Sequence, residues 1–474
     1  MSDGIDNSSL PSMNLLSHKH PHHKKHSLTP YDKNSRSLLK PLLYTLESPS
    51  PPHAFTENIG YNTQLYPFLS TKSMAYRKKY SIKQILVDHQ NWWRFYEKHK
   101  KTLRDSIVLT IVKLLSCKNL VRGYQVYQCS NPNCSHTKRF PFTCKSKACS
   151  SCGKKATDIW IQKQHQILPN TTWQHITFTM PAQLWDFFWY NRSLLNLIAK
   201  IAAECIQSIA RKKKLIPGIF IAIHTFGRDL KRNVHIHVST TTGGISEDQR
   251  HWKNLFFDQK TLMRMWRYRI IQLFRRTEQR QALIIPSKLQ KQFNHTFTFS
   301  QFLDQLYKKT WIVHCSKPSN DHQQNVNYLG RYIKRPPIAE SKLKHYDGAE
   351  VTFNYLDHTT KTYRRLSMSS EEFIGRFVQH IPDIGFRMIR YYGFLAHRVR
   401  GKMLPIVYRL LQQDNIQTTA SPTYAELMQK NFSFNPFTCI LCGQQLVLSY
   451  MYFGLSSAKS LLPFHRPLAL LQKI

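Results

Sequence analysis

The hexapeptide NVHIHV (233–238) places two histidines two residues apart within an apolar run. Successive side chains of a β-strand point to opposite faces, so His235 and His237 would share one face while the apolar side chains pack on the other. Two neighbouring imidazoles on one face are an arrangement that can bind a metal ion. The same pattern also fits two surface histidines on a basic protein, so the pair alone does not decide.

A third ligand is suggested by the preceding apolar segment, GIFIAIHTF (218–226), which alternates as a second strand. The short polar connection between the two segments predicts a hairpin. His224 would then lie close to His235 across the strand pair. His224 is therefore the candidate third metal ligand, and Asp229 in the connection is a weaker one.

A metal site needs a reacting group, and the segment NVNYLGRYIKRPPI (325–338) offers two phenols. Tyr328 and Tyr332 are four residues apart and would share one face of a helix that the following prolines end. Such pairs often pack in a core. Two features favour a phosphate-facing interpretation: the basic residues Arg331, Lys334 and Arg335, and the suitability of two phenols for two successive covalent steps.

A cysteine-rich block (129–152) ends in C-x2-C followed by glycine, the pattern of a zinc knuckle. It predicts one structural four-thiolate zinc site made of Cys129, Cys134, Cys149 and Cys152, with Cys144 as a substitute. His136 is a weaker ligand candidate, and a set of buried free cysteines is the alternative.

The other cysteines give weaker signals. Near the C-terminus, CILCG contains Cys439 and Cys442, which offer half of a second site. Cys117, Cys205 and Cys315 have no cysteine within knuckle spacing and are expected to be buried.

Charge sets the class of partner. The 474 residues include 68 Lys and Arg against 27 Asp and Glu, a formal net charge of +41. This excess favours a nucleic acid partner. No segment has the roughly 18 uninterrupted apolar residues of a membrane-spanning helix, and the polar start is not a signal peptide. We therefore expect a cytoplasmic, DNA-associated protein whose cysteines bind metal.

Arginine alternates with aromatic residues in RMWRYRIIQLFRR (264–276). Arg264, Arg267 and Arg269 could contact phosphates while an exposed ring stacks on an unpaired base. An ordinary helix with a solvated basic face is the alternative.

The chain is expected to have an α+β fold, in which an antiparallel sheet flanked by helices follows a helical, zinc-binding module. Strands are predicted at 174–181, 218–226 and 233–244, the last ending in a Gly-Gly turn, with a helix at 192–214. The predicted regions are a disordered basic tail (1–75), a helical and zinc-binding domain (76–160), a catalytic domain (165–370) and a C-terminal helical region with a CxxC tail (371–474).

The order of the cysteine block, HTFGRDLKRNVHIHV and YLGRYIKRPPIAESKL resembles the two-tyrosine HUH transposases of rolling-circle insertion sequences, over roughly residues 80–445. HUH stands for His, hydrophobic, His, here His235-Ile236-His237. The resemblance implies the HUH endonuclease fold and an enzyme that nicks and rejoins single-stranded DNA through covalent 5′-phosphotyrosine intermediates. It implies Tyr328 and Tyr332 as nucleophiles, His235 and His237 as ligands of Mg2+ or Mn2+, and structural zinc in the cysteine block.

The expected partners are single-stranded DNA at the ends of the element, with host replication factors as further candidates. Two alternatives are a replication initiator or relaxase with the same HUH site, and a non-catalytic zinc-dependent protein that binds nucleic acid. The cysteine block before the HUH strand and the RPPI sequence after the tyrosines favour the transposase.

Overall fold

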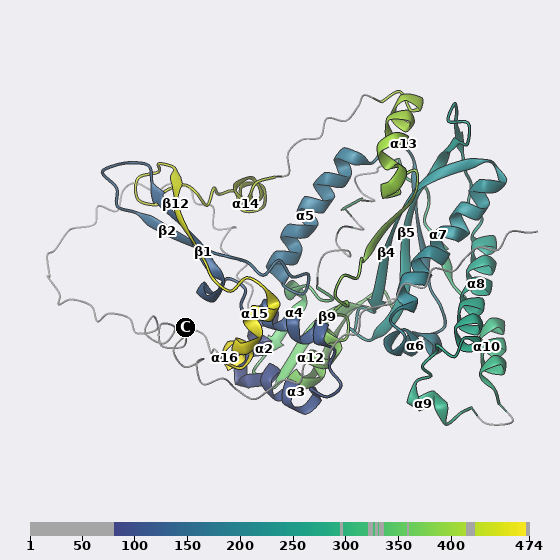
Figure 1. Cartoon of the computed structure of the whole chain (residues 1–474), viewed down its shortest axis with the longest axis horizontal. Helices are drawn as coiled ribbons and strands as arrows, with labels where there is room; N and C mark the ends of the chain where they lie inside the picture. Colours follow the sequence, from purple (N-terminus) through teal and green to yellow (C-terminus); the bar gives the residue numbers. More distant parts are fainter. Residues whose placement is uncertain are drawn as a thin grey trace, which may run out of the picture. The chain divides into compact units, whose positions relative to one another are not determined.

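The computed structural model describes residues 80–293, 297–320, 326–327, 330, 336–357, 360–413 and 422–470 (Figure 1). The chain from Ala75 to Ile474 is one compact unit. The predicted tail (1–75) lies outside the described residues, which begin at Tyr80, and so do Tyr328, Arg331, Tyr332, Lys334 and Arg335.

A six-stranded sheet in the order β11-β4-β5-β3-β7, with β6 paired to β5, forms the centre of the fold. Its strands are β3 (Trp173–Phe178), β4 (Leu215–Phe226), β5 (Arg232–Ser246), β6 (Trp252–Asn254), β7 (Val313–Cys315) and β11 (Ile389–Gly393). Every pair in it is antiparallel. The predicted α+β class with an antiparallel sheet flanked by helices is confirmed.

The predicted Gly-Gly turn at the end of the HUH strand is wrong. β5 continues through Gly243 and Gly244 to Ser246, and β6 pairs with this extension. Glycine is needed there for close packing, because a Cβ on Gly243 would lie 2.5 Å from the indole nitrogen of Trp252. The absence of a side chain at Gly243 therefore makes room for an aromatic ring against the strand.

One face of this sheet packs on helices. Those helices are α6 (Trp185–Tyr190), α7 (Leu194–Lys212), α8 (Gln259–Gln279) and α10 (Phe299–Lys308), with the short η4 (Ala182–Leu184) and α9 (Ser287–Gln290) beside them. Val234, Ile236 and Val238 of β5 are buried in this core together with isoleucines of β4. The apolar side of the HUH strand thus faces α7 and α8. Because side chains alternate along a strand, His235 and His237 lie on the opposite face.

The opposite face is covered by α5 (Ser150–Ile167) and α13 (His397–Leu410) (Figure 1). Phe220 and Ala222 of β4 are buried there with Trp160 of α5 and with Val326. Gly330 lies against the same helix, because a Cβ built on it would clash with the side chain of Ile161. Val326 and Gly330 therefore both pack on α5.

A second core joins residues from both ends of the described chain. Its elements are α2 (Ile82–Val87), η2 (Asp88–Gln90), α3 (Asn91–His99), α4 (Asp105–Leu115), η5 (Glu340–Lys342), β8 (Leu343–Tyr346), β9 (Glu350–Leu356), β10 (Tyr363–Ser369), α12 (Ser370–Val378), α15 (Ala458–Leu461), η6 (Leu462–Phe464) and α16 (His465–Leu470). The indole of Trp92 in α3 donates a hydrogen bond to His465 in α16, at 2.7 Å. The segment that begins near residue 371 therefore shares a core with the N-terminal helices.

A small sheet in the order β12-β1-β2 also joins distant segments. Its strands are β1 (Gly123–Cys129), β2 (Thr137–Pro141) and β12 (Leu446–Phe453); η3 (Leu120–Arg122) precedes β1, and α14 (Tyr424–Phe432) precedes β12. Within the described part of the chain, no helix has the length and apolar character needed to cross a membrane.

Candidate active site and metal centres

Three histidines meet on the face of the central sheet that α5 covers. His224 pairs directly with His235 across β4 and β5, and His237 pairs with Ala222 two residues along. One ligand nitrogen from each lies within 4.8 Å of the other two. The structure thus brings together the three residues that the sequence suggested, whereas Asp229 is outside this group.

The histidine site is largely buried. His224 and His237 are 2% and 7% exposed. Burial lowers the pKa of His237 well below its ordinary value, and the neighbouring imidazoles of His224, His235 and His175 act in the same direction. His237 is therefore neutral at pH 7, and a neutral imidazole keeps a lone pair that can bind a metal ion.

A fourth histidine, His175 of β3, was not identified from the sequence. Its Nε2 lies 3.0 Å from Nδ1 of His237 and 3.2 Å from the Thr177 hydroxyl. Burial, with a smaller effect of His314, lowers the pKa of His175 to about 4. A partner on one ring nitrogen fixes the orientation and tautomer of an imidazole. His175 is thus placed to orient His237.

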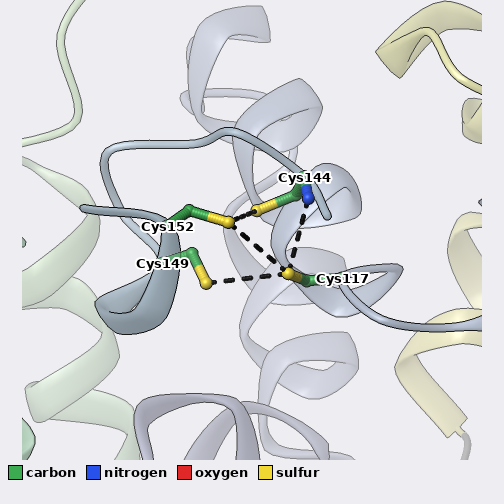
Figure 2. A group of neighbouring side chains, drawn as sticks. All are labelled: Cys117, Cys144, Cys149 and Cys152. Atoms are coloured by element: carbon green, nitrogen blue, oxygen red, sulfur yellow. Dashed lines mark hydrogen bonds between the residues drawn. The ribbon is translucent and has the colours of Figure 1, made fainter. Parts of the chain in front are cut away.

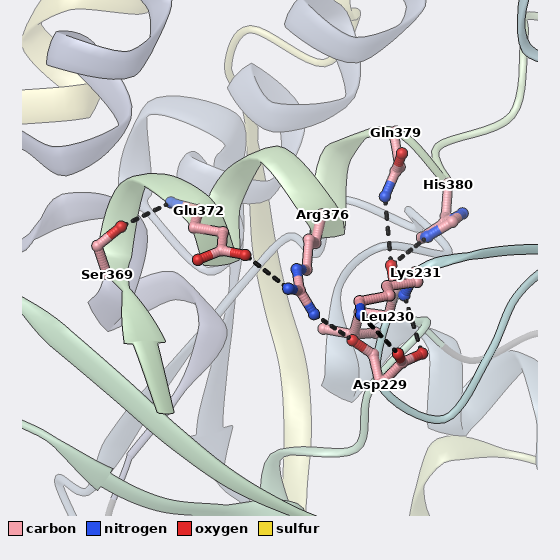
Figure 3. Close-up of polar contacts among 8 residues, drawn as sticks. All are labelled: Asp229, Leu230, Lys231, Ser369, Glu372, Arg376, Gln379 and His380. Carbon is pink, nitrogen blue, oxygen red and sulfur yellow. Dashed lines mark hydrogen bonds and ion pairs between the residues drawn. The ribbon is translucent and has the colours of Figure 1, made fainter. Parts of the chain in front are cut away.

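The β4–β5 turn that carries Asp229 is held by the end of α12 (Figure 3). The Leu230 carbonyl accepts hydrogen bonds from the Gln379 side chain (3.2 Å) and from Nε2 of His380 (2.9 Å). The Asp229 carboxylate accepts from the Lys231 backbone N–H at 3.1 Å. Asp229 therefore closes the turn, which explains why it does not join the histidines.

The start of α12 positions a further contact to this turn. The Ser369 hydroxyl accepts from the Glu372 N–H at 3.1 Å, and the Glu372 carboxylate pairs with Arg376 at 2.6 Å. Arg376 in turn donates to the Asp229 carbonyl at 3.0 Å (Figure 3). Ser369 is the N-cap of α12, and the hydroxyl of the next residue, Ser370, donates to the Gly348 carbonyl. Helix α12 thus positions the Arg376 guanidinium against the turn between β4 and β5.

The cysteines form two groups of four. The first group is Cys117, Cys144, Cys149 and Cys152, at the end of α4, after β2 and at the start of α5 (Figure 2). Cys117 Sγ lies 3.8 Å from the sulfurs of Cys149 and Cys152, and the Cys144 and Cys152 sulfurs are 3.6 Å apart. Zinc–sulfur bonds of about 2.3 Å in a tetrahedron require sulfurs about 3.8 Å apart. This donor set therefore fits a structural zinc ion.

The single site predicted from Cys129, Cys134, Cys149 and Cys152 does not form. Cys129 and Cys134 belong to the second group, with Cys439 and Cys442. The β1–β2 hairpin explains the division: Cys117 and Cys144 lie before and after it, so the antiparallel strands bring these two together at its base.

The remaining cysteine predictions have mixed outcomes. Cys144 is a member of the first group rather than a spare, and Cys117, predicted only to be buried, completes it. Cys205 is buried as predicted and Cys315 is partly exposed.

Comparisons with known proteins give matches over the histidine group and over the first cysteine group. Residues 218–402 match the family described as "Putative transposase", and residues 88–180 match the "Transposase zinc-binding domain". The transposase for insertion sequence element IS801 of Pseudomonas savastanoi pv. phaseolicola is 39% identical over 394 residues, covering 82% of this chain and 94% of that protein. The chain belongs to this transposase family.

A second relative of the transposase is less similar. A putative transposase of Sinorhizobium fredii (strain NBRC 101917 / NGR234) is 28% identical over 306 residues, which cover 63% of this chain and 76% of that protein. No solved structure matches the chain. The resemblance to the transposases of rolling-circle insertion sequences is confirmed, and transposition is favoured over a replication initiator or relaxase.

Each of the two family matches contains one of these groups of residues. The transposase match contains His224, His235 and His237, and the zinc-binding match contains the whole first cysteine group. Together with that donor set, the match supports structural zinc in the N-terminal region. Cys439 and Cys442 lie beyond both matches.

The arginines of α8 differ in their surroundings. Arg264 is exposed, whereas the Arg267 guanidinium lies 4.3 Å from the centre of the Tyr307 ring, and Arg269 donates to the Ser208 hydroxyl at 2.9 Å. The second and third arginines thus help to attach α8 to α10 and α7. A DNA-binding role for the three arginines of the transposase stays a prediction.

The buried His380 is expected to make the stability of the transposase depend on pH. Burial lowers the pKa of His380 to about 4, and Arg232 adds to this effect while the Leu230 carbonyl opposes it. In the unfolded chain a histidine titrates near pH 6.5. The unfolded state therefore binds a proton that the folded state excludes, and stability falls by about 1.4 kcal/mol per unit as pH drops from 6.5 towards 4.

Urea unfolding at pH 7.5 and pH 5.5 would measure this effect. His380→Gln removes the titrating group, so the wild type should lose about 1 kcal/mol more than the variant between these two pH values. The cysteines and the other histidines are common to both proteins and cancel in the comparison. An equal loss in both proteins would show that His380 is not responsible.

Proposed function

We propose that the transposase nicks and rejoins single-stranded DNA at the ends of its element through covalent 5′-phosphotyrosine intermediates. Tyr328 and Tyr332 are the proposed nucleophiles, and His224, His235 and His237 the proposed metal site. The observation that carries the proposal is the convergence of three imidazoles on one sheet face within the transposase match.

The three imidazoles suit a divalent cation because burial keeps His237 neutral and because all three can present a nitrogen to one point. Bound there, Mg2+ or Mn2+ would draw charge from a non-bridging oxygen of the scissile phosphate. Imidazole ligands suit Mn2+ better than Mg2+, which prefers oxygen. We therefore expect Mn2+ to support the reaction at lower concentration.

Two described residues just before Tyr328, Val326 and Asn327, make contacts on the side of the sheet that carries the histidines. Val326 is buried with Phe220 and Ala222, which alternate with His224 on one face of β4. Nε2 of His165 in α5 lies 3.4 Å from the Asn327 side chain. These contacts of flanking residues support a nucleophile near the histidine site.

The proposed chemistry balances without an external energy source. The phenolic oxygen of one tyrosine forms a bond to phosphorus as the bond from phosphorus to the 3′-oxygen breaks. The phenol loses its proton and the 3′-oxygen gains one. The phosphotyrosine keeps a phosphodiester bond, so a 3′-hydroxyl of another strand can attack it and release the tyrosine. A second tyrosine allows a second strand to be cut while the first end stays attached.

The formal charge of +41 supports a polyanionic partner, and we propose single-stranded DNA as the substrate. The relatives come from bacteria, so we place the reaction in the bacterial cytoplasm, with host replication factors as further partners.

The test is to trap the covalent intermediate. Single-stranded oligonucleotides that tile the ends of the encoding element, labelled at the 3′ end, are incubated with the transposase and Mn2+ and then denatured. We expect label on the protein, in the peptide that contains residues 328 and 332. The same oligonucleotides labelled at the 5′ end should leave the protein unlabelled, because that label departs with the free 3′-hydroxyl.

Attachment elsewhere in the chain would overturn the assignment of the nucleophiles. Complete absence of an adduct across all oligonucleotides, with binding retained, would instead favour the non-catalytic DNA-binding alternative.

A further inference from the structure

We propose that Cys129, Cys134, Cys439 and Cys442 bind a second zinc ion, which fastens the C-terminal strand β12 to the N-terminal zinc-binding region. Two of these cysteines lie outside the matched zinc-binding domain, which ends at residue 180. The proposal is independent of the nicking chemistry.

The sulfur positions fit one tetrahedral ion. All four sulfurs lie within 4.8 Å of one another. The Cys129 and Cys442 sulfurs are 3.4 Å apart, and those of Cys134 and Cys439 are 3.8 Å apart. These values are close to the edge of about 3.8 Å that four zinc–sulfur bonds require. All four cysteines are free thiols, so disulfide bonds do not compete for them.

The C-terminal pair is carried by a turn with its own hydrogen bonds. The Cys439 N–H donates to the Gln444 carbonyl at 2.7 Å, and the Gly443 N–H donates to the Cys439 carbonyl at 3.0 Å. Gly443 has a left-handed φ of 75°, which glycine adopts without strain. C-x2-C followed by glycine in this conformation forms a zinc knuckle.

The N-terminal pair lies on the turn at the far end of the β1–β2 hairpin. The Cys129 N–H donates to the His136 carbonyl at 3.0 Å, and the Cys134 N–H donates to the Asn131 carbonyl at 3.0 Å. Each turn therefore holds two thiols in place by its own backbone contacts. The sequence alone could not pair them, because 305 residues separate Cys134 from Cys439.

Contacts around the cysteines join the same two turns. Nδ1 of His136 lies 3.1 Å from the Cys439 sulfur, and the Lys138 ammonium donates to the Pro436 carbonyl at 3.1 Å. The Ser130 N–H donates to the Gln445 carbonyl at 2.9 Å. A polar side chain in contact with a ligand sulfur can support that ligand from outside, as is common around metal sites. His136 thus acts as a partner of a ligand.

Strand β12 has little buried surface, so a zinc ion beside it would have a structural role. Every residue of β12 after Leu446 is exposed. The apolar cluster beneath it contains, as buried members, only Leu446 and two of the cysteines among the residues that the structure describes. A strand with so little buried surface is weakly held by pairing alone, and a structural zinc ion supplies the missing folding energy.

The test measures zinc in purified full-length protein. The wild type is compared with Cys439→Ser/Cys442→Ser, with Cys117→Ser/Cys144→Ser and with Cys205→Ser/Cys315→Ser as a matched control outside both groups. We expect each of the first two double variants to lose one zinc ion per chain and the control to lose none. Zinc bound by the histidines is common to all four proteins and cancels.

Hydrogen exchange gives a second measurement. In Cys439→Ser/Cys442→Ser the amides of β12 should lose protection, whereas those of α4 and α7 should keep theirs. Retention of full zinc content by this variant, loss of two ions, or unchanged protection of β12 would each overturn the proposal of a separate second site.

Discussion

Replacing both His235 and His237 with alanine is expected to abolish metal-dependent nicking while leaving DNA binding within about twofold of the wild type. A divalent ion that withdraws charge from a phosphate contributes several kcal/mol, which corresponds to a rate loss of at least about 1000-fold. Binding should persist, because phosphate contacts by lysines and arginines provide most of the affinity and the formal charge is unchanged.

A matched control is His251→Ala with His345→Ala. Both histidines are exposed and lie outside the histidine group. Nicking of a 3′-labelled single-stranded oligonucleotide across a Mn2+ titration, and filter binding of the same oligonucleotide, should be unaffected in this control. If binding falls as far as nicking in the His235 and His237 variant, the pair has a structural role and not a catalytic one.

Local patterns in the sequence predicted the two strands that carry the histidine group well. Alternation in 218–226 and 233–238 defines which side chains share a face, and a short polar connection brings the two strands together. Both features depend only on neighbouring residues. That is why the sequence alone could place His224 opposite His235, and the two residues are direct partners across β4 and β5.

Contacts that depend on the pairing of distant strands could not be predicted from the sequence. His175 approaches His237 because β3 pairs with β5, and strand order is not encoded in the alternation of either strand. The cysteines were misassigned for a related reason. Spacing along the chain grouped Cys129 with Cys152, whereas the β1–β2 hairpin places them at opposite ends and brings Cys117 into the group at its base.

The C-terminal segment illustrates the same limit. Its CxxC motif was recognised as half of a site, but its partners are the cysteines of the β1–β2 turn, more than 300 residues earlier. Only the pairing of β12 with β1 reveals this arrangement. Sequence spacing identified the CxxC motif, but it did not identify the distant cysteines that lie beside it.

The largest effect is expected for Tyr328→Phe combined with Tyr332→Phe, which should eliminate the covalent DNA adduct. Phenylalanine keeps the aromatic ring but lacks the oxygen that is proposed to attack phosphorus, and removal of a nucleophile typically costs at least about 1000-fold in rate. Each single variant should still form an adduct through the remaining tyrosine if that tyrosine can start the reaction. Each should also fail to complete transposition, because the proposed reaction cuts a second strand while the first end stays attached to a tyrosine.

The control for this variant is Tyr363→Phe with Tyr450→Phe, since both tyrosines are exposed and lie on strands outside the histidine site. Adduct formation is measured with the 3′-labelled oligonucleotide after denaturation, and transposition with a marked element in cells. An adduct formed at the wild-type rate by the double variant would show that the nucleophile lies elsewhere. The proposal requires both tyrosines, because each holds one strand end while the other end is cut. Transposition by either single variant would therefore show that one phenol is sufficient and would contradict the proposal.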